Sequence, residues 1–237
     1  MNREYARSAP WYDKIYSFKD YAAEAAMLRS LVERHRPGAR RLLDVACGTG
    51  EHLRHLSHHF DVVGLDASEA MLKVARRKLP GVPLNRADMR TFDLGLTFDA
   101  AICMFGAMGH LGDEGELLVA IRRIVRHLVP GGVLIVEPWL VPEVFVPGKV
   151  SGLFVDEPEL KIARINVGRR QGRKAILDMH HLIGTSAGVE AFVERLELTL
   201  FSQDAYQSAM AAVGMSVEFD PQGPMGRGLF VGVLTAG

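Results

Sequence analysis

The chain of 237 residues carries 28 lysines and arginines against 28 aspartates and glutamates, and 48% of its residues are apolar. That apolar content is enough for a buried core, whereas the zero net charge excludes an overall field that would attract nucleic acid or an anionic membrane. The chain shows neither a signal-peptide core nor an apolar run of membrane-spanning length. Its two cysteines, Cys47 and Cys103, lie in apolar strand-like segments and are expected to be buried and reduced. We therefore expect a soluble, cytoplasmic protein.

The first part of the chain alternates between helical and strand patterns. In chain order, these patterns predict a helix at 21–35, a strand at 40–47, a short helix, a strand at 61–66, a helix capped by Ser68 and ended by Pro80-Gly81, strands at 82–88 and 98–105, a helix at 114–128 and a strand at 133–138. Pro130-Gly131-Gly132 is expected to break the last helix before its strand. Strands that alternate with helices predict a parallel, doubly wound α/β sheet.

The pattern changes after residue 148. Four strand-like segments follow one another up to about residue 201 without crossover helices, which predicts an appended antiparallel β-sheet. A helix at 203–214 and strands at 215–220 and 228–235 should then return to the main sheet. We therefore expect three units: a cofactor-binding core with an N-terminal helical cap at 1–147, the antiparallel insertion at 148–201 and the C-terminal return at 202–237.

Acidic residues follow three consecutive predicted strands. Asp44 precedes the turn CGTG (47–50), whose glycines let the backbone approach a ligand at a helix N-terminus. Asp66 ends the second strand, where a carboxylate can chelate ribose hydroxyls, and Asp88 with Met89 suits an adenine ring. A nicotinamide-binding motif is the rival interpretation, but its third glycine is absent. Each acid singly fits an ordinary strand end or helix cap, whereas their placement after consecutive strands favours a nucleoside site.

These residues resemble three motifs of the S-adenosylmethionine-dependent methyltransferases, here DVACGTG (44–50), GLD (64–66) and ADMR (87–90). That superfamily usually has glycine at the position of Ala46. The resemblance implies a class I methyltransferase fold, which is a Rossmann-like doubly wound sheet, with S-adenosylmethionine as cofactor, S-adenosylhomocysteine as product and no metal. It implies cofactor contacts from Tyr12, Tyr21, Asp44, Ala46, Gly48, Gly50, Asp66, Met71, Asp88, Met89 and Met104.

Longer phrases look like the N,N-dimethyltransferases of nucleotide-linked deoxyaminosugars, which act in the pathways to desosamine- and mycaminose-type sugars of macrolide antibiotics. The phrases are KDYAAEA (19–25), LLDVACGTGEHL (42–53), DMRTFDLG (88–95), CMFGAMGHL (103–111), VEPW (136–139) and GPMGRGLFVGV (223–233). The resemblance implies two successive methyl transfers from S-adenosylmethionine to the amine of a thymidine diphosphate (TDP) sugar. It also implies a homodimer formed through the appended sheet.

In that family a histidine in the loop after the fourth strand lies beside the sugar amine, and His110 matches it. A tyrosine near the N-terminus sits close by, and Tyr5 is the matching candidate. The sequence leaves open whether His110 accepts the proton of the amine or only orients the nitrogen. The small residues Gly106, Ala107 and Gly109 are expected to leave space for a bulky nucleotide sugar.

Four further residues are candidates to bind the nucleotide sugar: Trp139, Arg170, His181 and Arg227. Arg227 is expected to contact the diphosphate, because a guanidinium fork suits phosphate oxygens. Arg170 fits a solvated hairpin turn equally well, and His181 fits a surface or dimer role. Leu140, Val167 and Met225 stand where relatives often have tryptophan, histidine and serine, which leaves the identity of the sugar open.

A histidine cluster offers a competing interpretation. His52, His55 and His59 share one flank of a predicted helix at a spacing that can bind a metal. The apolar stripe beside them predicts that these histidines lie on a solvated edge of the helix. Methyl transfer from a sulfonium also needs no metal.

Three other functions compete with the sugar methyltransferase. A methyltransferase for another small amine or hydroxyl is the nearest, and the phrase GPMGRGLF (223–230) argues against it. A nucleic-acid methyltransferase is disfavoured by the zero net charge and by the absence of an Asn/Asp-Pro-Pro-aromatic motif. A cofactor-binding subunit without catalysis is disfavoured by the strand-end acids together with His110 and Tyr5.

Overall fold

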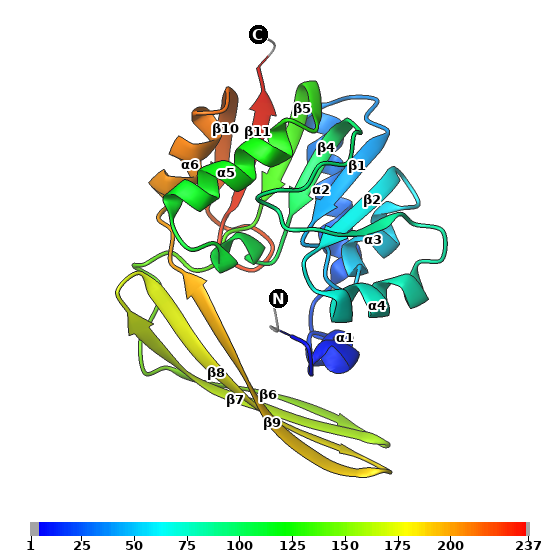
Figure 1. Cartoon of the computed structure of the whole chain (residues 1–237), viewed down its shortest axis with the longest axis vertical. Coiled ribbons are helices and arrows are strands. Elements are labelled where there is room, and N and C mark those ends of the chain that lie inside the picture. Colours follow the sequence, from blue (N-terminus) through cyan, green and yellow to red (C-terminus); the bar gives the residue numbers. More distant parts are fainter. Residues whose placement is uncertain (1–4, 236–237) are drawn as a thin grey trace.

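The computed structural model describes residues 5–235, which form two β-sheets with an N-terminal segment (residues 5–20) between them (Figure 1). A seven-stranded sheet flanked by helices makes the main body, and a four-stranded sheet lies below it (Figure 1). Within the described residues, no helix is long and apolar enough to cross a membrane.

The seven-stranded sheet has the order β10-β11-β5-β4-β1-β2-β3. Its strands are β1 (Arg41–Val45), β2 (Asp61–Asp66), β3 (Leu84–Arg86), β4 (Phe98–Cys103), β5 (Leu128–Val136), β10 (Met215–Asp220) and β11 (Leu229–Leu234). The five strands of the first half pair in parallel, whereas β11 runs antiparallel to both β5 and β10. The predicted doubly wound sheet, and the return of the C-terminal strands to it, are therefore confirmed.

Apolar clusters cover both faces of this sheet and hold its helices. The helices are η1 (Ala9–Trp11), α1 (Tyr12–Ile15), α2 (Tyr21–His35), α3 (Glu51–Leu56), α4 (Glu69–Lys78), η2 (Ala107–His110), α5 (Glu114–Val125) and α6 (Gln203–Ala211). Ser68 caps α4 by accepting a hydrogen bond from the backbone N–H of Met71, as predicted. Asp20 and Asp113 cap α2 and α5 in the same way.

The boundary between α5 and β5 differs from the prediction. The helix ends at Val125, and the strand begins at Leu128 and runs through Pro130-Gly131-Gly132, so these residues do not break a helix before the strand. The pairing with β4 shifts register between Phe98 and Ala100. This irregularity accommodates the proline, which lacks an N–H, and Gly131 at φ +74°.

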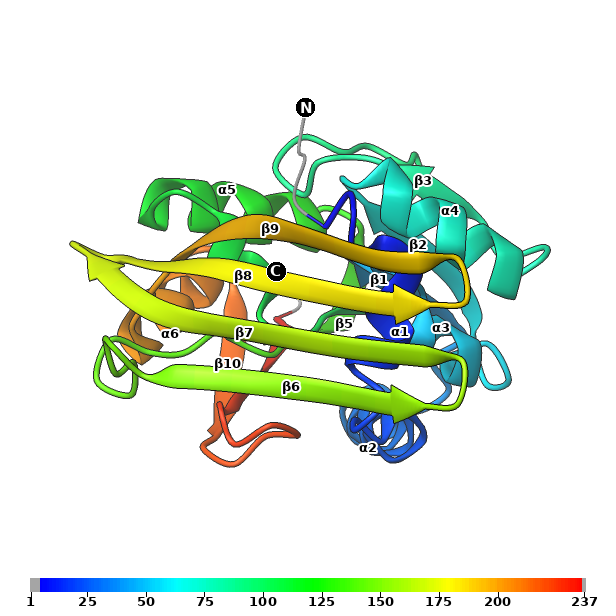
Figure 2. The same cartoon turned by 90° about the horizontal axis from the view of Figure 1, so that it is seen from below.

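The second sheet confirms the predicted antiparallel insertion. It consists of β6 (Val150–Glu157), β7 (Leu160–Gln171), β8 (Lys174–Thr185) and β9 (Gly188–Thr199), joined in sequence order. Figure 2 shows these strands side by side across the underside of the molecule. Alternation along each strand sends one set of side chains towards the main body and the other set outwards.

The N-terminal segment is attached to both sheets. Ile15 of α1 and Tyr16, directly after it, pack in an apolar cluster with residues of β7, β8 and β9. On the other side, Asp13 accepts hydrogen bonds from the hydroxyl of Thr49, in the turn after β1, and from Lys78 of α4. The segment therefore closes one side of the space between the two sheets.

Candidate active site

A cavity of about 490 Å³ lies where these three parts meet. Its walls are the residues that follow β1, β2 and β4, the inward face of the four-stranded sheet and the N-terminal segment. This position, beyond the carboxyl ends of parallel strands, is where open α/β sheets bind ligands.

Asp66 at the end of β2 forms the acidic part of the cavity wall. One carboxylate oxygen accepts a hydrogen bond from the N–H of Gly48 at 2.8 Å, and the other accepts one from the N–H of Ser68 at 2.7 Å. Burial raises the pKa of Asp66, while these two backbone bonds and the nearby His110 lower it. The carboxylate is thus held in one orientation at the edge of the cavity.

The turn that supplies the N–H of Gly48 needs an unusual backbone. Ala46 has φ +60° and Gly48 has φ +55°, in the left-handed region where a Cβ is disfavoured. This explains physically why glycine would be preferred at position 46. Both residues line the cavity.

Asp44 lies behind this wall and does not line the cavity. Its side chain is 2% exposed, and one of its carboxylate oxygens has no hydrogen-bond partner among the described residues. Burial raises the pKa of Asp44 well above its usual value, and the charge of Asp66 raises it further. The two acids therefore repel each other inside the protein.

Asp88 and Met89 line the cavity after β3, the strand that pairs with β2. The carboxylate of Asp88 accepts hydrogen bonds from the guanidinium of Arg90 at 2.6 and 2.9 Å, and these hold its pKa below the usual value. Arg90 also donates to Glu116 at 2.7 Å. Asp88 is therefore ionised and fixed in position by its own neighbour.

The loop after β4 carries His110 to the cavity on the short helix η2. Gly106 and Gly109 leave room there for Trp139. A Cβ on Gly106 would lie 3.1 Å from the Cα of Trp139, and one on Gly109 would lie 3.0 Å from its Cβ. The missing side chains therefore allow close packing of Trp139, while Gly106 and Ala107 also line the cavity, so space for the nucleotide sugar at these positions stays a prediction.

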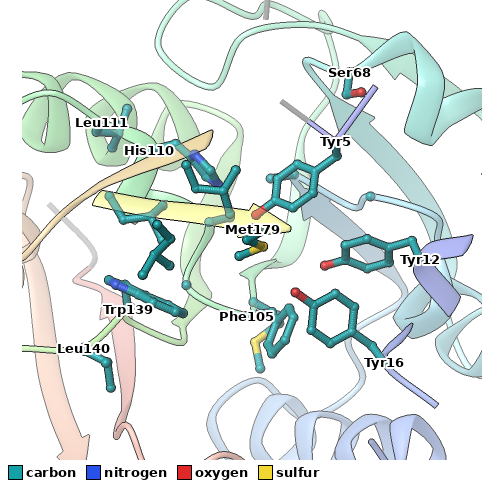
Figure 3. Close-up of a pocket in the computed structure, with 18 of the residues that line it drawn as sticks. Tyr5, Tyr12, Tyr16, Ser68, Phe105, His110, Leu111, Trp139, Leu140 and Met179 are labelled. Atoms are coloured by element: carbon teal, nitrogen blue, oxygen red, sulfur yellow. The ribbon is translucent and has the colours of Figure 1, made fainter. Parts of the chain in front are cut away.

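A group of tyrosines faces His110 across the cavity (Figure 3). The hydroxyls of Tyr5, Tyr12 and Tyr16 point into the cavity, opposite His110 and Trp139 (Figure 3). The ring of Tyr5 lies 5.9 Å from that of His110 and 5.8 Å from that of Tyr12. Burial and the neighbouring tyrosines raise the pKa of Tyr12 well above its usual value, so Tyr12 is a neutral hydrogen-bond donor at neutral pH.

The floor of the cavity comes from the four-stranded sheet, and most of its residues were missed from the sequence. The apolar part consists of Leu177, Met179, Leu196 and Leu198, and the polar part of Lys149, Ser151, Arg164 and Asn166. Arg164 donates a hydrogen bond to the hydroxyl of Tyr16 at 2.8 Å. Alternation along β7 indicates that Arg164 and Asn166 share a face, but no sequence signal shows which face turns inwards.

Arg227 reaches the cavity from the loop between β10 and β11. Its guanidinium lies 4.7 Å from the ring centroid of Trp139 and 5.1 Å from that of Phe105. Three glycines of this loop have positive φ: Gly223, Gly226 and Gly228. The loop therefore depends on glycine to present Arg227 to the two aromatic rings.

Twelve of the predicted site residues line this cavity: Tyr5, Tyr12, Ala46, Gly48, Asp66, Met71, Asp88, Met89, Met104, His110, Trp139 and Arg227. Five lie outside its lining: Tyr21, Asp44, Gly50, Arg170 and His181. Gly50 is required by packing, because a Cβ there would lie 2.7 Å from Leu79. His181 is 4% exposed and stacks on Phe192 with ring centroids 4.7 Å apart, while Arg170 bonds backbone carbonyls of Pro142 and Gly172.

The histidines of α3 do not all lie on a solvated helix edge. His52 is 8% exposed and is hydrogen-bonded at 2.8 Å to Glu24, which also accepts a hydrogen bond from the buried Lys19 at 2.6 Å. The prediction of a solvated helix edge is therefore wrong for His52, because α2 packs against this side of α3. No cluster of three or more potential metal ligands occurs between residues 5 and 235.

Comparison with known proteins gives matches over nearly the whole chain. A methyltransferase domain model matches residues 42–132. The dTDP-3-amino-3,6-dideoxy-alpha-D-glucopyranose N,N-dimethyltransferase of Streptomyces fradiae is 45% identical, over 95% of this chain and 90% of that protein. The dTDP-3-amino-3,4,6-trideoxy-alpha-D-glucopyranose N,N-dimethyltransferase of Streptomyces venezuelae is 44% identical, over 94% and 95%. The S-adenosylmethionine-bound structure of an amino pentose methyltransferase from Micromonospora echinaspora, involved in calicheamicin biosynthesis, has a TM-score of 0.87 at 43% identity, over 94% and 96%.

Proposed function

This chain belongs to the family of S-adenosylmethionine-dependent N,N-dimethyltransferases of dTDP-linked aminosugars, and on that premise we propose that it transfers two methyl groups in succession to the amine of such a sugar. The observation that carries the proposal is one cavity that joins a fixed, buried carboxylate, Asp66, to the facing pair His110 and Tyr5. The product enters the biosynthesis of an antibiotic sugar.

The residues along the main sheet fit the cofactor. The carboxylate of Asp66, oriented by two backbone N–H groups, retains lone pairs that suit two ribose hydroxyls. Asp88 and Met89 then border the adenine, and Met104 and Tyr12 border the methionyl end. When bound, S-adenosylmethionine supplies a methyl group on a positively charged sulfur.

His110 and Tyr5 hold the sugar amine. Their ring centroids lie 5.9 Å apart with the ring planes nearly perpendicular, and both residues line the same cavity. The amine attacks only when neutral, so His110 accepts its proton or orients its lone pair. Holding the nitrogen in line with the methyl carbon contributes several kcal/mol, on the order of the effect of a well-oriented intramolecular reaction.

The diphosphate lies towards Arg227, with Lys149 and Ser151 on the sheet side. Arg227 and Lys149 supply the positive charge that two phosphates require, and Trp139 beside Arg227 offers an aromatic face to the sugar or base. The apolar floor around Met179 suits the deoxygenated part of a sugar, because a hydroxyl there would lose its hydrogen bonds to water.

A mass-spectrometric assay tests the proposal. The protein is incubated with S-adenosylmethionine and a panel of dTDP-linked aminosugars that differ in the carbon bearing the amine and in their deoxygenated positions. We expect at least one sugar to gain one and then two methyl groups. A panel that stays unmodified, while a different small amine or hydroxyl compound gains a methyl group, would refute the proposal in favour of another small-molecule methyltransferase.

We also propose that the protein is a homodimer formed through the outward face of the four-stranded sheet. Seven apolar side chains are exposed there: Val150, Phe154, Ile165, Val167, Leu182, Val189 and Val193. No described segment of the chain covers this face, and a second copy can cover it by two-fold symmetry. Analytical ultracentrifugation should show a dimer that Phe154→Arg converts to monomer, whereas a monomeric wild type would overturn the assignment.

The cysteines fit a reducing compartment such as the cytoplasm. Cys47 and Cys103 are free thiols, and both are buried. Burial raises the pKa of each thiol, which keeps them protonated and unreactive. We propose that they are packing residues with no part in methyl transfer.

A further inference from the structure

Glu137 is a fully buried acid that the chemistry proposed above does not use. It directly follows β5, its exposed fraction is 0%, and it does not line the cavity. One of its carboxylate oxygens accepts a hydrogen bond from the backbone N–H of Phe105 at 2.7 Å. The other oxygen finds no hydrogen-bond partner within residues 5–235. A buried carboxylate that is only half satisfied is costly, which calls for a compensating role.

The hydrogen bond from Phe105 holds an unfavourable backbone turn. Phe105 has φ +58° and Gly106 has φ +73°, so two successive residues after β4 are left-handed, one of them with a bulky side chain. Backbone bonds join the same two segments: the N–H of Glu137 donates to Cys103 at 3.0 Å, and the N–H of Gly106 donates to the carbonyl of Glu137 at 3.2 Å. The turn sits between Met104 and the short helix that carries His110.

Two cations also gather at this turn. The ammonium of Lys19, which is itself buried, lies 4.3 Å from the ring centroid of Phe105, and the guanidinium of Arg227 lies 5.1 Å from it. Burial raises the pKa of Glu137 above its usual value, and the charges of Arg227 and Lys19 offset this only in part. A nitrogen of Arg227 is buried without a hydrogen-bond partner among the described residues. Lys19 already has a countercharge in Glu24, 2.6 Å from its ammonium, so the carboxylate of Glu137 acts mainly as a countercharge for Arg227.

We propose that Glu137 is a positioning residue with two separable actions. Its hydrogen-bond acceptor holds the turn at Phe105, and so fixes Met104 and His110 for methyl transfer. Its negative charge holds Arg227 against Phe105, and so fixes the contact with the nucleotide sugar. The inference rests on the proposed function for its kinetic assay.

Two variants of similar volume separate the actions. Glu137→Gln keeps an acceptor for the N–H of Phe105 and removes the charge, whereas Glu137→Met removes both. For Glu137→Gln we expect KM for the nucleotide sugar to rise about tenfold with kcat within about threefold of wild type. For Glu137→Met we expect the same rise in KM and, in addition, a fall in kcat of about tenfold or more. Steady-state kinetics on the best sugar of the panel measures both.

Binding and stability measurements distinguish the two proposed actions of Glu137 from a general loss of folding. Calorimetric titration should show weaker binding of the nucleotide sugar by both variants, and thermal unfolding should show cooperative transitions. Glu218→Gln, at an exposed site on β10, should match wild type throughout. Equal kcat in the two variants, or wild-type KM in Glu137→Gln, would overturn the inference.

If Glu137→Met does not fold, Glu137→Gln alone decides, because a loss of kcat without a rise in KM contradicts the assigned charge role. If the wild type methylates no sugar of the panel, the proposed function is refuted. That result differs from a failure of the inference about Glu137, which compares the variants with wild type.

Discussion

The two facing walls of the cavity are held in different ways. In the core wall (Ala46, Gly48, Asp66, Ser68, Asp88), backbone N–H groups of adjacent turns fix the side chains, as Gly48 and Ser68 fix Asp66. In the sheet wall (Lys149, Ser151, Arg164, Asn166, Met179), Arg164 donates a hydrogen bond to Tyr16 of the N-terminal segment, 148 residues away. The core wall is therefore held within the strand-and-turn units of the main sheet, whereas the sheet wall depends on docking of the N-terminal segment.

The docking of the N-terminal segment against the sheet wall is mainly apolar. The ion pair of Lys14 with Glu157 joins two half-exposed side chains, and such pairs contribute at most about 1 kcal/mol. Ile15 and Tyr16 are buried in a cluster with residues of the four-stranded sheet, and burial of each such side chain contributes about 1.5–3 kcal/mol. Changes in the sheet wall should consequently affect the tyrosines of the segment, while changes in the core wall should not.

Asp66→Ala should have the largest effect. It removes a charged acceptor that is already oriented, and hydrogen bonds to charged groups contribute about 1.5–3 kcal/mol each. We expect S-adenosylmethionine to bind about 100-fold more weakly or worse by calorimetric titration. Asp61→Ala, at the exposed opposite end of the same strand, is the matched control. Unchanged affinity in Asp66→Ala would show that the core wall does not bind the ribose.

His110→Asn tests the boundary between the two walls. If His110 accepts the proton of the amine, kcat should fall about 100-fold, which is typical for loss of a general base. Binding of S-adenosylmethionine should stay within about threefold, because Asp66 keeps its two backbone bonds. The profile of kcat against pH distinguishes the roles: a variant with nearly wild-type kcat at every pH has lost only an orienting group. The exposed His58→Asn serves as control.

Much of the core wall was predictable from the sequence, and the reason is local. Ser68 lies two residues from Asp66, and Gly48, 18 residues from it, lies in the turn after the adjacent parallel strand. Both turns follow strands with strong apolar patterns, so their roles can be inferred from the strand-and-turn pattern of the sequence. The left-handed turn at Phe105 gave no such signal, because a bulky residue there is held by Glu137, 32 positions away.

The sheet wall was only partly predictable. Four antiparallel strands followed from the pattern, but the inward face depends on how the whole sheet docks, which period-two alternation does not specify. His181 was consequently chosen as a substrate contact, whereas the structure buries it against Phe192, and Arg164 and Met179 were not identified.

Arg164→Met is expected to weaken the function of the sheet wall and to leave that of the core wall unchanged. It removes the hydrogen bond to the hydroxyl of Tyr16 while keeping a long apolar stem. We expect KM for the nucleotide sugar to rise about three- to tenfold, in line with the loss of about 1 kcal/mol, and binding of S-adenosylmethionine to stay unchanged. Arg34→Met, at an exposed position of α2 in the main body, is the control. If Arg164→Met also loses affinity for S-adenosylmethionine, the two walls are coupled rather than separate.

Asp44→Asn should have the smallest effect and should change stability instead of binding. The folded-state pKa of Asp44 is raised above its ordinary value of 3.8, so above that pH the folded state binds more protons than the unfolded state and stability falls as pH rises. Below that pH Asp44 is protonated in both states, and asparagine resembles it closely. The free energy of unfolding without cofactor should therefore match wild type at low pH and exceed it by about 1–2 kcal/mol at neutral pH, as measured by denaturant titration. Asp61→Asn, at an exposed site, should show no such divergence, and a variant less stable than wild type at neutral pH would mean that the charge of Asp44 stabilises the core wall.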